Sequence, residues 1–284
     1  MQDQDFTRRR MLAGTGISLA AAAAVGAGKS DAPAHSARFA GKVALVTGAT
    51  SGMGAVTARA LAAEAARVVF CGRRADEGRA VEKSIRDAGG EALFVQTDVT
   101  IEEQVRAMLA TVEARYSRLD FAFNNVGSGS GLAPLHQLAT ADFDRVMTTN
   151  LRGNFLQMKY EIPLMLKSGG GSIVGNSSIG GLRYLANNSH YTAAKHGVTA
   201  MYCTAAIEYA KQNIRINVVC PGFIKTEKAM MVTGGNEKIF DSRIPMGRIG
   251  SSEDVSDAVL WLFSDQSRYV TGTVLPIDGG QSVL

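Results

Sequence analysis

The sequence contains few cysteines and prolines, and both shortages exclude whole classes of protein. Its three cysteines form no Cys-x-x-Cys pair and no cluster with histidine, so neither a disulfide framework nor a metal site such as a zinc centre is expected. Glycine is abundant, at 31 of 284 residues, but with only six prolines the glycines indicate neither collagen nor a linker. Cys71, Cys203 and Cys220 all lie in apolar runs, which predicts buried structural thiols.

Neither sign of charge is in large excess. Thirty lysines and arginines stand against 26 aspartates and glutamates, and after residue 34 the positive charges are spread along the chain. This balance gives no reason to expect nucleic acid or an acidic membrane surface as a partner. Hydrophobic residues make up 46% and charged residues 20%, which is typical of a folded globular protein and excludes disorder for the bulk of the chain.

Residues 1–36 differ from the rest of the chain. The segment TRRRMLA at 7–13 leads into an alanine-rich apolar run that ends at Ala27, and the small residues Ala32-Pro33-Ala34 follow. A charged start, an apolar middle and a small-residue end are typical of a signal peptide, and the paired arginines resemble a twin-arginine export signal. The run is short of the ~20 strongly apolar residues of a membrane-spanning helix, so no integral span is expected in the mature chain.

We therefore expect residues 1–36 to be a leader with a linker, and the protein to be exported to the periplasm. Two alternatives stay open. The protein is cytoplasmic with an uncleaved extension, or the uncleaved extension tethers it to a membrane. Neither alternative changes the chemistry expected of residues 37–284.

Residues 37–284 alternate between short apolar runs and longer segments with apolar residues at helical spacing. Strands alternating with helices of about ten residues or more predict βαβ units and a parallel sheet. Without an internal repeat or a second hydrophobic core, we predict a single α/β domain: a Rossmann-like, doubly wound parallel sheet with helices on both faces. The expected strands are 42–47, 68–71, 92–96, 120–124, 172–176, 214–219 and 273–277, and the expected helices are 53–65, 75–88, 101–116, 141–167, 190–212 and 252–263.

A glycine-rich turn, TGATSGMG at 47–54, joins the first expected strand to the first helix. Glycines there allow a tight turn and close approach of a pyrophosphate, which the N-terminus of the following helix binds. The spacing G-x-x-x-G-x-G differs from the commoner G-x-G-x-x-G, and no Gly-Lys-Ser/Thr follows, so a nucleotide triphosphatase is not expected. A turn that serves only packing has a similar sequence, so this motif does not decide the function alone.

The second expected strand ends in Cys71-Gly72-Arg73-Arg74. An acidic residue at this point binds the adenosine ribose of NAD, and none is present. Arg73 can instead form charge-assisted hydrogen bonds with the 2′-phosphate of NADP, which favours NADP(H) over NAD(H). The alternative is that Arg73 and Arg74 are solvated charges at the start of a helix.

Ser178, Tyr191 and Lys195 form the second candidate set. Tyr191 and Lys195 are four residues apart in YTAAK, so they share a face of the expected helix. The pKa of tyrosine is ordinarily about 10, and a nearby ammonium favours the phenolate, so Lys195 is expected to lower the pKa of Tyr191. Ser178 follows the fifth expected strand, at the sheet edge where cofactor and substrate meet.

Together these motifs resemble those of the short-chain dehydrogenases/reductases, in the branch with chains of about 250 residues. The resemblance covers residues 39–284, and its three departures, at Met53, Ala65 and Val126, do not touch the expected chemistry. The matching pieces occur in the family's order: TGATSGMG at 47–54, Asp98-Val99, NNVG at 124–127, Asn150, Ser178, YTAAK at 191–195, Pro221-Gly222 with Thr226, and TGTVLPIDGG at 271–280.

The resemblance implies a role for each matching residue. Tyr191 is the general acid/base, Lys195 lowers its pKa and binds the nicotinamide ribose, and Ser178 holds the substrate oxygen. Asn150 anchors a water in a proton relay behind Lys195. With Arg73, the implied cofactor-binding residues are Gly48, Ser51, Gly52, Met53, Gly54, Asp98, Val99, Asn125, Tyr191, Lys195, Pro221, Gly222, Ile224 and Thr226.

We therefore expect an NAD(P)-dependent oxidoreductase that interconverts a carbonyl and a secondary alcohol, without a metal. The alternative is a non-catalytic protein that senses NAD(P) on the same fold. The family further implies a homotetramer with helices 141–167 and 190–212 in an interface. Residues 227–249 form either an apolar lid over the substrate or a helical pair on the surface, and the sequence leaves the small-molecule substrate open among sugars, steroids, oxoacyl thioesters and other ketones.

Overall fold

The computed structural model describes residues 37–129, 131–232 and 243–284. The leader predicted for residues 1–36, and the middle of the segment 227–249, lie outside these ranges. Among the described helices, none has both the length and the apolar character that a bilayer crossing requires.

Seven parallel strands form one sheet in the order β3-β2-β1-β4-β5-β6-β7, which confirms the predicted Rossmann-like architecture. The strand order reverses between β1 and β4, and in such sheets the ligand crevice opens outside the carboxyl ends of these two strands. The strands are β1 (Val43–Val46), β2 (Arg67–Gly72), β3 (Glu91–Gln96), β4 (Phe121–Asn124), β5 (Gly171–Asn176), β6 (Ile214–Pro221) and β7 (Val274–Ile277).

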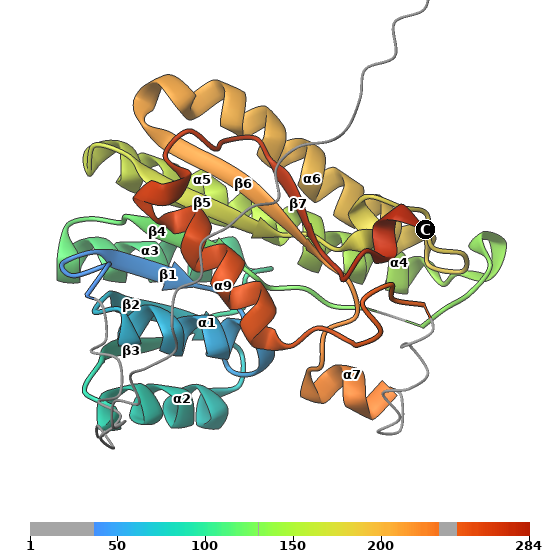
Figure 1. Ribbon diagram of the computed structural model, residues 1–284, viewed down its shortest axis with the longest axis horizontal. Coiled ribbons are helices and arrows are strands. Elements are labelled where there is room, and N and C mark those ends of the chain that lie inside the picture. The colour runs from blue at the N-terminus through green and yellow to red at the C-terminus, as the bar shows by residue number, and fades with distance from the viewer. Residues whose placement is uncertain (1–36, 130, 233–242) are drawn as a thin grey trace, which may run out of the picture. The chain divides into compact units, whose positions relative to one another are not determined.

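Helices cover both faces of the sheet (Figure 1). Helices α1 (Gly52–Ala63), α2 (Ala75–Asp87) and α9 (Ser252–Phe263) enclose one apolar layer with Val46 and Phe70. Helices α3 (Glu102–Tyr116), α5 (Gly153–Lys167) and α6 (Ser189–Tyr209) enclose the other with Leu45 and Val69. Because neighbouring residues of a strand point to opposite faces, the buried strands β1 and β2 contribute to both layers. The short helix α7 (Glu227–Val232) follows β6.

The helix expected at 141–167 is interrupted. Helix α4 (Thr140–Met147) leads into a π-helical turn at Thr148–Arg152, and α5 begins at Gly153. A π-turn widens the helix locally and occurs often at functional sites. Asn150 lies in this turn and is completely buried. The chain is therefore helical over the expected residues, but the π-helical turn within them was not predicted.

Two of the three cysteines are buried as predicted, and one is not. Cys71 and Cys220 lie in the sheet, whereas Cys203 is partly exposed on α6. Its thiol donates a weak hydrogen bond to the carbonyl oxygen of Gly272, at 3.7 Å, because this side of α6 faces the chain that leads into β7.

Candidate active site

The glycine turn after β1 has the backbone geometry that its sequence predicts. Gly48 and Gly52 have φ angles of +63° and +55°, in the left-handed region that favours glycine. Helix α1 starts at Gly52, its N-cap Ser51 makes no side-chain capping bond, and its first turn carries no acidic residue. Its N–H groups and dipole therefore suit an anion such as the diphosphate of a dinucleotide.

Gly54 and Asn125 stabilise the shape of this turn. Asn125 Nδ2 donates to the carbonyl oxygens of Thr47 at 3.2 Å and Gly48 at 3.1 Å. A Cβ at Gly54 would lie 2.6 Å from Asn125 Nδ2, so glycine is required at that contact. Asn176 Nδ2 in turn donates to Asn125 Oδ1 at 2.9 Å, which links the turn to β5.

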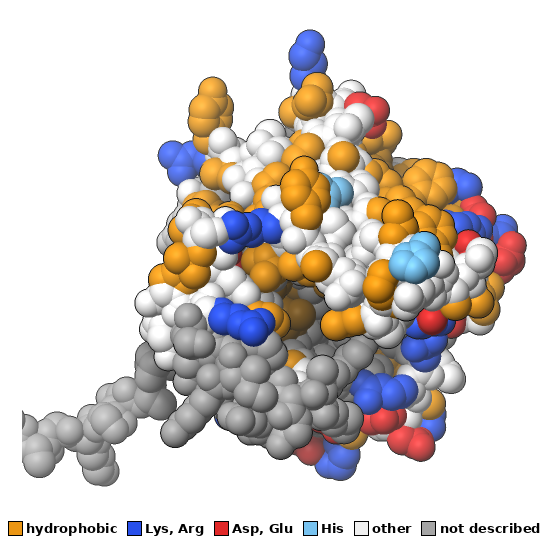
Figure 2. Space-filling view, turned by 90° about the vertical axis from the view of Figure 1, so that its right-hand side faces the viewer, with side chains coloured by type: hydrophobic (Ala, Val, Ile, Leu, Met, Phe, Trp, Pro, Cys, Tyr) orange, Lys and Arg blue, Asp and Glu red, His pale blue; other side chains and the backbone are white. Residues whose placement is uncertain are grey.

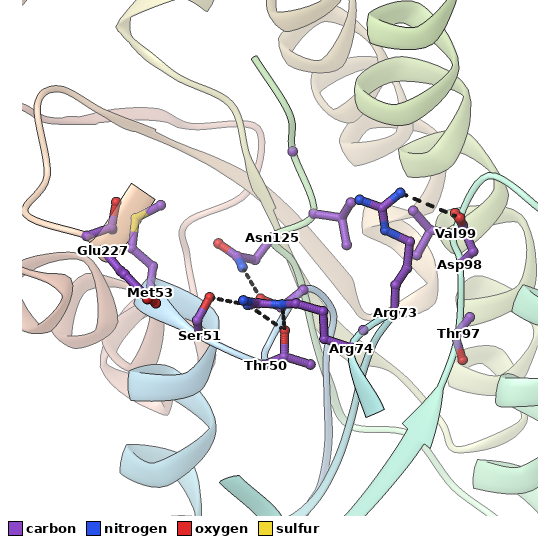
Figure 3. Close-up of a pocket in the computed structure, with 16 residues that line it drawn as sticks. Thr50, Ser51, Met53, Arg73, Arg74, Thr97, Asp98, Val99, Asn125 and Glu227 are labelled. Atoms are coloured by element: carbon purple, nitrogen blue, oxygen red, sulfur yellow. Dashed lines mark hydrogen bonds and ion pairs between the residues drawn. The ribbon is translucent and has the colours of Figure 1, made fainter. Parts of the chain in front are cut away.

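A pocket of about 300 Å³ lies between the glycine turn and the ends of β2 and β3 (Figure 3). Arg73 and Arg74 stand at its side: Arg73 Nη1 is 3.8 Å from Asp98 Oδ2, and Arg74 Nη2 donates to Ser51 Oγ at 2.6 Å. The predicted residues that line it are Gly48, Ser51, Gly52, Met53, Arg73, Asp98, Val99, Asn125 and Thr226.

Sequence reasoning assigned no function to Arg74, which also donates to Thr50 Oγ1 at 2.9 Å. The guanidinium thus lies across the glycine turn, beside the helix N-terminus. Gly72 leaves room for the Thr50 side chain that accepts this bond, because a Cβ at position 72 would lie 2.6 Å from Thr50 Cγ2. A second arginine directly after Arg73 was the only sequence sign of this arrangement, and it is equally typical of a solvated helix start.

Ser178, Tyr191 and Lys195 line a second pocket of about 260 Å³. Met53, Asn125, Gly127 and Thr226 line both pockets, so the two are continuous. A dinucleotide held at the glycine turn can therefore reach the tyrosine and lysine. The other predicted residues that line the second pocket are Pro221, Gly222 and Ile224.

Lys195 is buried beneath the ring of Tyr191, as the spacing on one helix predicts. Its Nζ lies 5.7 Å from the ring centroid and donates to the carbonyl oxygen of Asn176 at 2.7 Å. Burial lowers the pKa of Lys195 to about 8. The side chain therefore remains mostly an ammonium at pH 7.

The pKa of Tyr191 differs from the prediction. Burial of the phenol raises this pKa, and a hydrogen bond with Ser178 opposes the rise. The net shift of the Tyr191 pKa is therefore opposite to the one expected, because burial of the phenol dominates and the Lys195 ammonium donates to the carbonyl oxygen of Asn176. Tyr191 is consequently protonated at neutral pH, the form that donates a proton.

Asn150 lies behind this pocket and does not line it. Its Oδ1 accepts from the backbone N–H of Ser128 at 2.7 Å, and its Nδ2 donates to the carbonyl oxygen of Ser128 at 2.8 Å. A Cβ at Gly127 would lie 3.3 Å from Lys195 Nζ and 3.4 Å from Asn150 Oδ1, so Gly127 separates these two groups. Asn150 therefore holds the loop after β4, which forms one wall of the pocket.

The face that carries the carboxyl ends of the strands is hollowed and rich in hydrophobic side chains (Figure 2). Leu132, Leu135 and Tyr184 are 70%, 73% and 88% exposed. Tyr184 stacks on His196, with 5.5 Å between ring centroids.

A family model described as enoyl-(acyl carrier protein) reductase matches residues 48–282. Cis-4-hydroxycyclohexanecarboxylate dehydrogenase of Sinomonas cyclohexanicum is 40% identical over 246 residues, which cover 87% of this chain and 98% of that protein. Cyclohexanol dehydrogenase of Acinetobacter sp. (strain SE19) is 38% identical over 242 residues, which cover 85% of this chain and 95% of that protein.

Solved structures show the same similarity. An actinorhodin polyketide ketoreductase variant crystallised with NADPH superposes with a TM-score of 0.82 at 34% sequence identity. The match covers 86% of this chain and 98% of that one. Sequence and fold thus agree over nearly all of residues 37–284.

Proposed function

Because the chain belongs to the short-chain dehydrogenase/reductase family, we propose that it interconverts a ketone and a secondary alcohol on a six-membered carbon ring, with NADP(H) as its preferred cofactor. The observation that carries this function is the joint position of Ser178, Tyr191 and Lys195 in a pocket continuous with the glycine turn. NAD(P)-dependent interconversion of carbonyl and alcohol groups is consistent with the relatives, which are hydroxyl-group dehydrogenases and reductases. No observation favours the non-catalytic alternative.

The ring substrate is supported by the relatives and by the size and lining of the pocket. Two relatives are named for hydroxylated cyclohexanes. The second pocket, of about 260 Å³, has Phe223, Ile224 and Ala229 on its apolar side. NADPH consumption with cyclic and linear ketones of equal carbon number tests this substrate class. We expect kcat/KM to be about tenfold higher for the cyclic ketones, and equal values would contradict it.

The reaction follows from the chain's own donors and acceptors. Bound nicotinamide supplies or accepts the hydride at the substrate carbon. In reduction, Ser178 holds the carbonyl oxygen and protonated Tyr191 donates its phenolic proton to that oxygen. The Lys195 ammonium then stabilises the phenolate that remains. Oxidation uses the same groups in reverse. The proposal includes no metal ion, and in the described ranges no three His, Cys, Asp or Glu side chains gather where they can share one.

The proposed preference for NADP(H) is supported by Arg73 and Arg74, the two arginines that follow β2. Exchange of Arg73 or Arg74 for alanine is expected to raise the KM for NADPH about tenfold, because each exchange removes a charge-assisted bond to the 2′-phosphate. The KM for NADH is expected to change little. Steady-state kinetics with both cofactors measures this.

Arg79→Ala is the matched control, because Arg79 forms an exposed ion pair with Asp76 on α2 and lines neither pocket. A wild-type enzyme that prefers NADH would overturn the assignment. An equal loss with both cofactors in the variants would also overturn it.

We propose a homotetramer in which α5 and α6 form part of an interface. A groove of about 520 Å³ runs between the outer sides of these helices, with Phe155, Ile162, Leu166 and Met201 among its residues. Phe155 and Leu166 are 48% and 43% exposed. Contact of these apolar side chains with water is unfavourable, and a second subunit would cover them. Sedimentation of the purified chain is expected to show a tetramer, and Phe155→Glu is expected to yield smaller species. A wild-type chain that sediments only as a monomer contradicts the proposal.

We also propose that residues 1–36 direct export by the twin-arginine route. The support is the segment TRRRMLA, the apolar run after it and the small residues at 32–34. The mass of the mature chain recovered from the periplasmic fraction tests this. A full-length chain confined to the cytoplasm contradicts it.

A further inference from the structure

Behind the active site lies a group of fully buried polar side chains. They come from β4, α5 and α6 and sit within the apolar layer on that side of the sheet. Burial of polar atoms is unfavourable unless hydrogen bonds compensate for it, so a whole group of them calls for a physical reason. The group comprises Asn124, Asn154, Gln157, Glu161 and Tyr202, each 0% exposed.

A chain of hydrogen bonds leads from Tyr202 to the active site. Tyr202 Oη donates to Asn154 Oδ1 at 2.7 Å, and Asn154 Nδ2 donates to the main-chain carbonyl oxygen of Asn150 at 2.7 Å. The Asn150 side chain then bonds to both backbone polar groups of Ser128. Ser128 itself lines the catalytic pocket. Three side chains thus connect the core to the pocket wall.

The middle of this chain is the π-helical turn at Thr148–Arg152. A π-turn departs from the regular hydrogen-bond ladder, and inserted side chains commonly stabilise such a departure. The buried amide of Asn154 does so here, because it bonds to the Asn150 carbonyl oxygen within the turn. Directly after the turn, Gln157 Nε2 donates to the Gly153 carbonyl oxygen at 2.9 Å. The geometry of the turn therefore depends on the orientation of the Asn154 amide.

Tyr202 fixes that orientation from a closely fitted position. A Cβ at Gly175 would lie 2.5 Å from Tyr202 Cε1, so the ring fits only because β5 carries glycine there. The next residue, Asn176, provides the carbonyl oxygen that binds Lys195. Burial raises the pKa of Tyr202 well above its ordinary value, so its hydroxyl remains a donor. Because the Tyr202 hydroxyl donates, the Asn154 atom that faces it must be the acceptor Oδ1. Asn154 Nδ2 then faces the π-turn and donates to it.

We propose that Tyr202 is a positioning residue of this enzyme: through Asn154 it fixes the π-turn that carries Asn150, and through Asn150 it fixes the Ser128 wall of the substrate pocket. The proposal rests on the proposed function for its kinetic consequence only. Its structural consequence, the order of the segments 126–129 and 148–153, is measurable without turnover.

Tyr202→Phe removes the hydroxyl and keeps the ring in place. We expect kcat for ketone reduction to fall about five- to tenfold, the loss of one buried hydrogen bond, while the dissociation constant for NADPH stays unchanged. In an Asn150→Ala background the same exchange is expected to have no further effect on kcat, because Tyr202 acts through Asn150. A purely structural role lowers kcat by the same factor in both backgrounds and would overturn the proposal.

Tyr160→Phe is the matched control. Tyr160 on α5 also donates its hydroxyl to one partner, Glu102 at 2.9 Å, and lies outside the chain of bonds to Asn150. Its loss is expected to leave kcat unchanged. An equal fall of kcat in Tyr160→Phe and Tyr202→Phe would contradict a specific role for Tyr202.

Amide hydrogen exchange read by mass spectrometry provides the second measurement. Tyr202→Phe is expected to accelerate exchange in 126–129 and 148–153 at least severalfold, and Tyr160→Phe to leave both segments unchanged. Unchanged exchange in Tyr202→Phe overturns the inference even if no ketone is turned over. A wild-type enzyme that reduces no ketone, with the expected exchange pattern in Tyr202→Phe, refutes the proposed function and leaves the positioning role standing.

Discussion

Tyr191→Phe is expected to reduce kcat for ketone reduction about 10³-fold while NADPH binding is preserved. The exchange removes only the phenolic hydroxyl, and the ring still covers Lys195 at 5.7 Å. Without that hydroxyl, no proton donor of the catalytic set stands beside Ser178 at the substrate oxygen. Single-turnover reduction measures the chemical step, and titration of NADPH fluorescence measures the binding.

Tyr184→Phe is the control for this experiment. Tyr184 is 88% exposed, lines neither pocket and stacks on His196, so its hydroxyl is not required for that contact. Its loss is expected to change kcat less than about twofold. If Tyr191→Phe reduces the ketone as fast as the wild type, another group donates the proton and the mechanism is refuted.

Glu161→Gln is expected to abolish part of the dependence of stability on pH. Glu161 is fully buried in α5, and burial raises its pKa from 4.5 to about 8. The folded protein thus keeps a proton that the unfolded chain releases, so the free energy of unfolding falls as pH rises from 4.5 to 8. At pH 7 the free energy of unfolding of the wild type is therefore lower than at acid pH by on the order of 3 kcal/mol. The variant does not undergo this decrease.

The hydrogen bonds around Glu161 lead us to expect that the fold accepts glutamine at this position. Asn124 Nδ2 donates to Glu161 Oε2 at 2.9 Å, and Asn124 Oδ1 and Glu161 Oε1 have no protein donor of their own. A proton on Oε1, or the amide N–H of the glutamine, is the donor that such a pair requires.

Urea unfolding of wild type and Glu161→Gln at several pH values between 4.5 and 8 provides the measurement. The control is Glu103→Gln, at the exposed start of α3, which is expected to keep the slope of the wild type. Parallel stability profiles for wild type and Glu161→Gln would show that the carboxyl is ionised in the fold.

The strands, the sheet and the Ser178–Tyr191–Lys195 set were predictable because local signals determine them. Apolar runs such as Val43–Val46 identify buried strands, and a four-residue spacing places Tyr191 and Lys195 on one helix face. The turn requires positive φ angles at Gly48 and Gly52, which few residue types other than glycine adopt. Each of these signals lies within a few residues of its effect.

The remainder depends on contacts between distant segments. The π-turn at Thr148–Arg152 contains no glycine or proline, and its stabilising groups include Tyr202 on another helix. The pKa of Tyr191 depends on how deeply the phenol is buried and on where Lys195 directs its ammonium, which spacing along one helix does not reveal. The hydrogen bond from Arg74 to Ser51 joins two segments that are distant in the sequence, and only the fold places them side by side.

The contact between Gly72 and Thr50 constrains how this enzyme can diverge. A Cβ at Gly72 would lie 2.6 Å from Thr50 Cγ2, whereas the Thr50 hydroxyl accepts hydrogen bonds from Arg74. Serine in place of Thr50 removes the obstructing methyl group and keeps that hydroxyl. An acidic residue at position 72 therefore requires the Thr50 side chain to move or to lose that methyl group, so positions 50 and 72 are coupled.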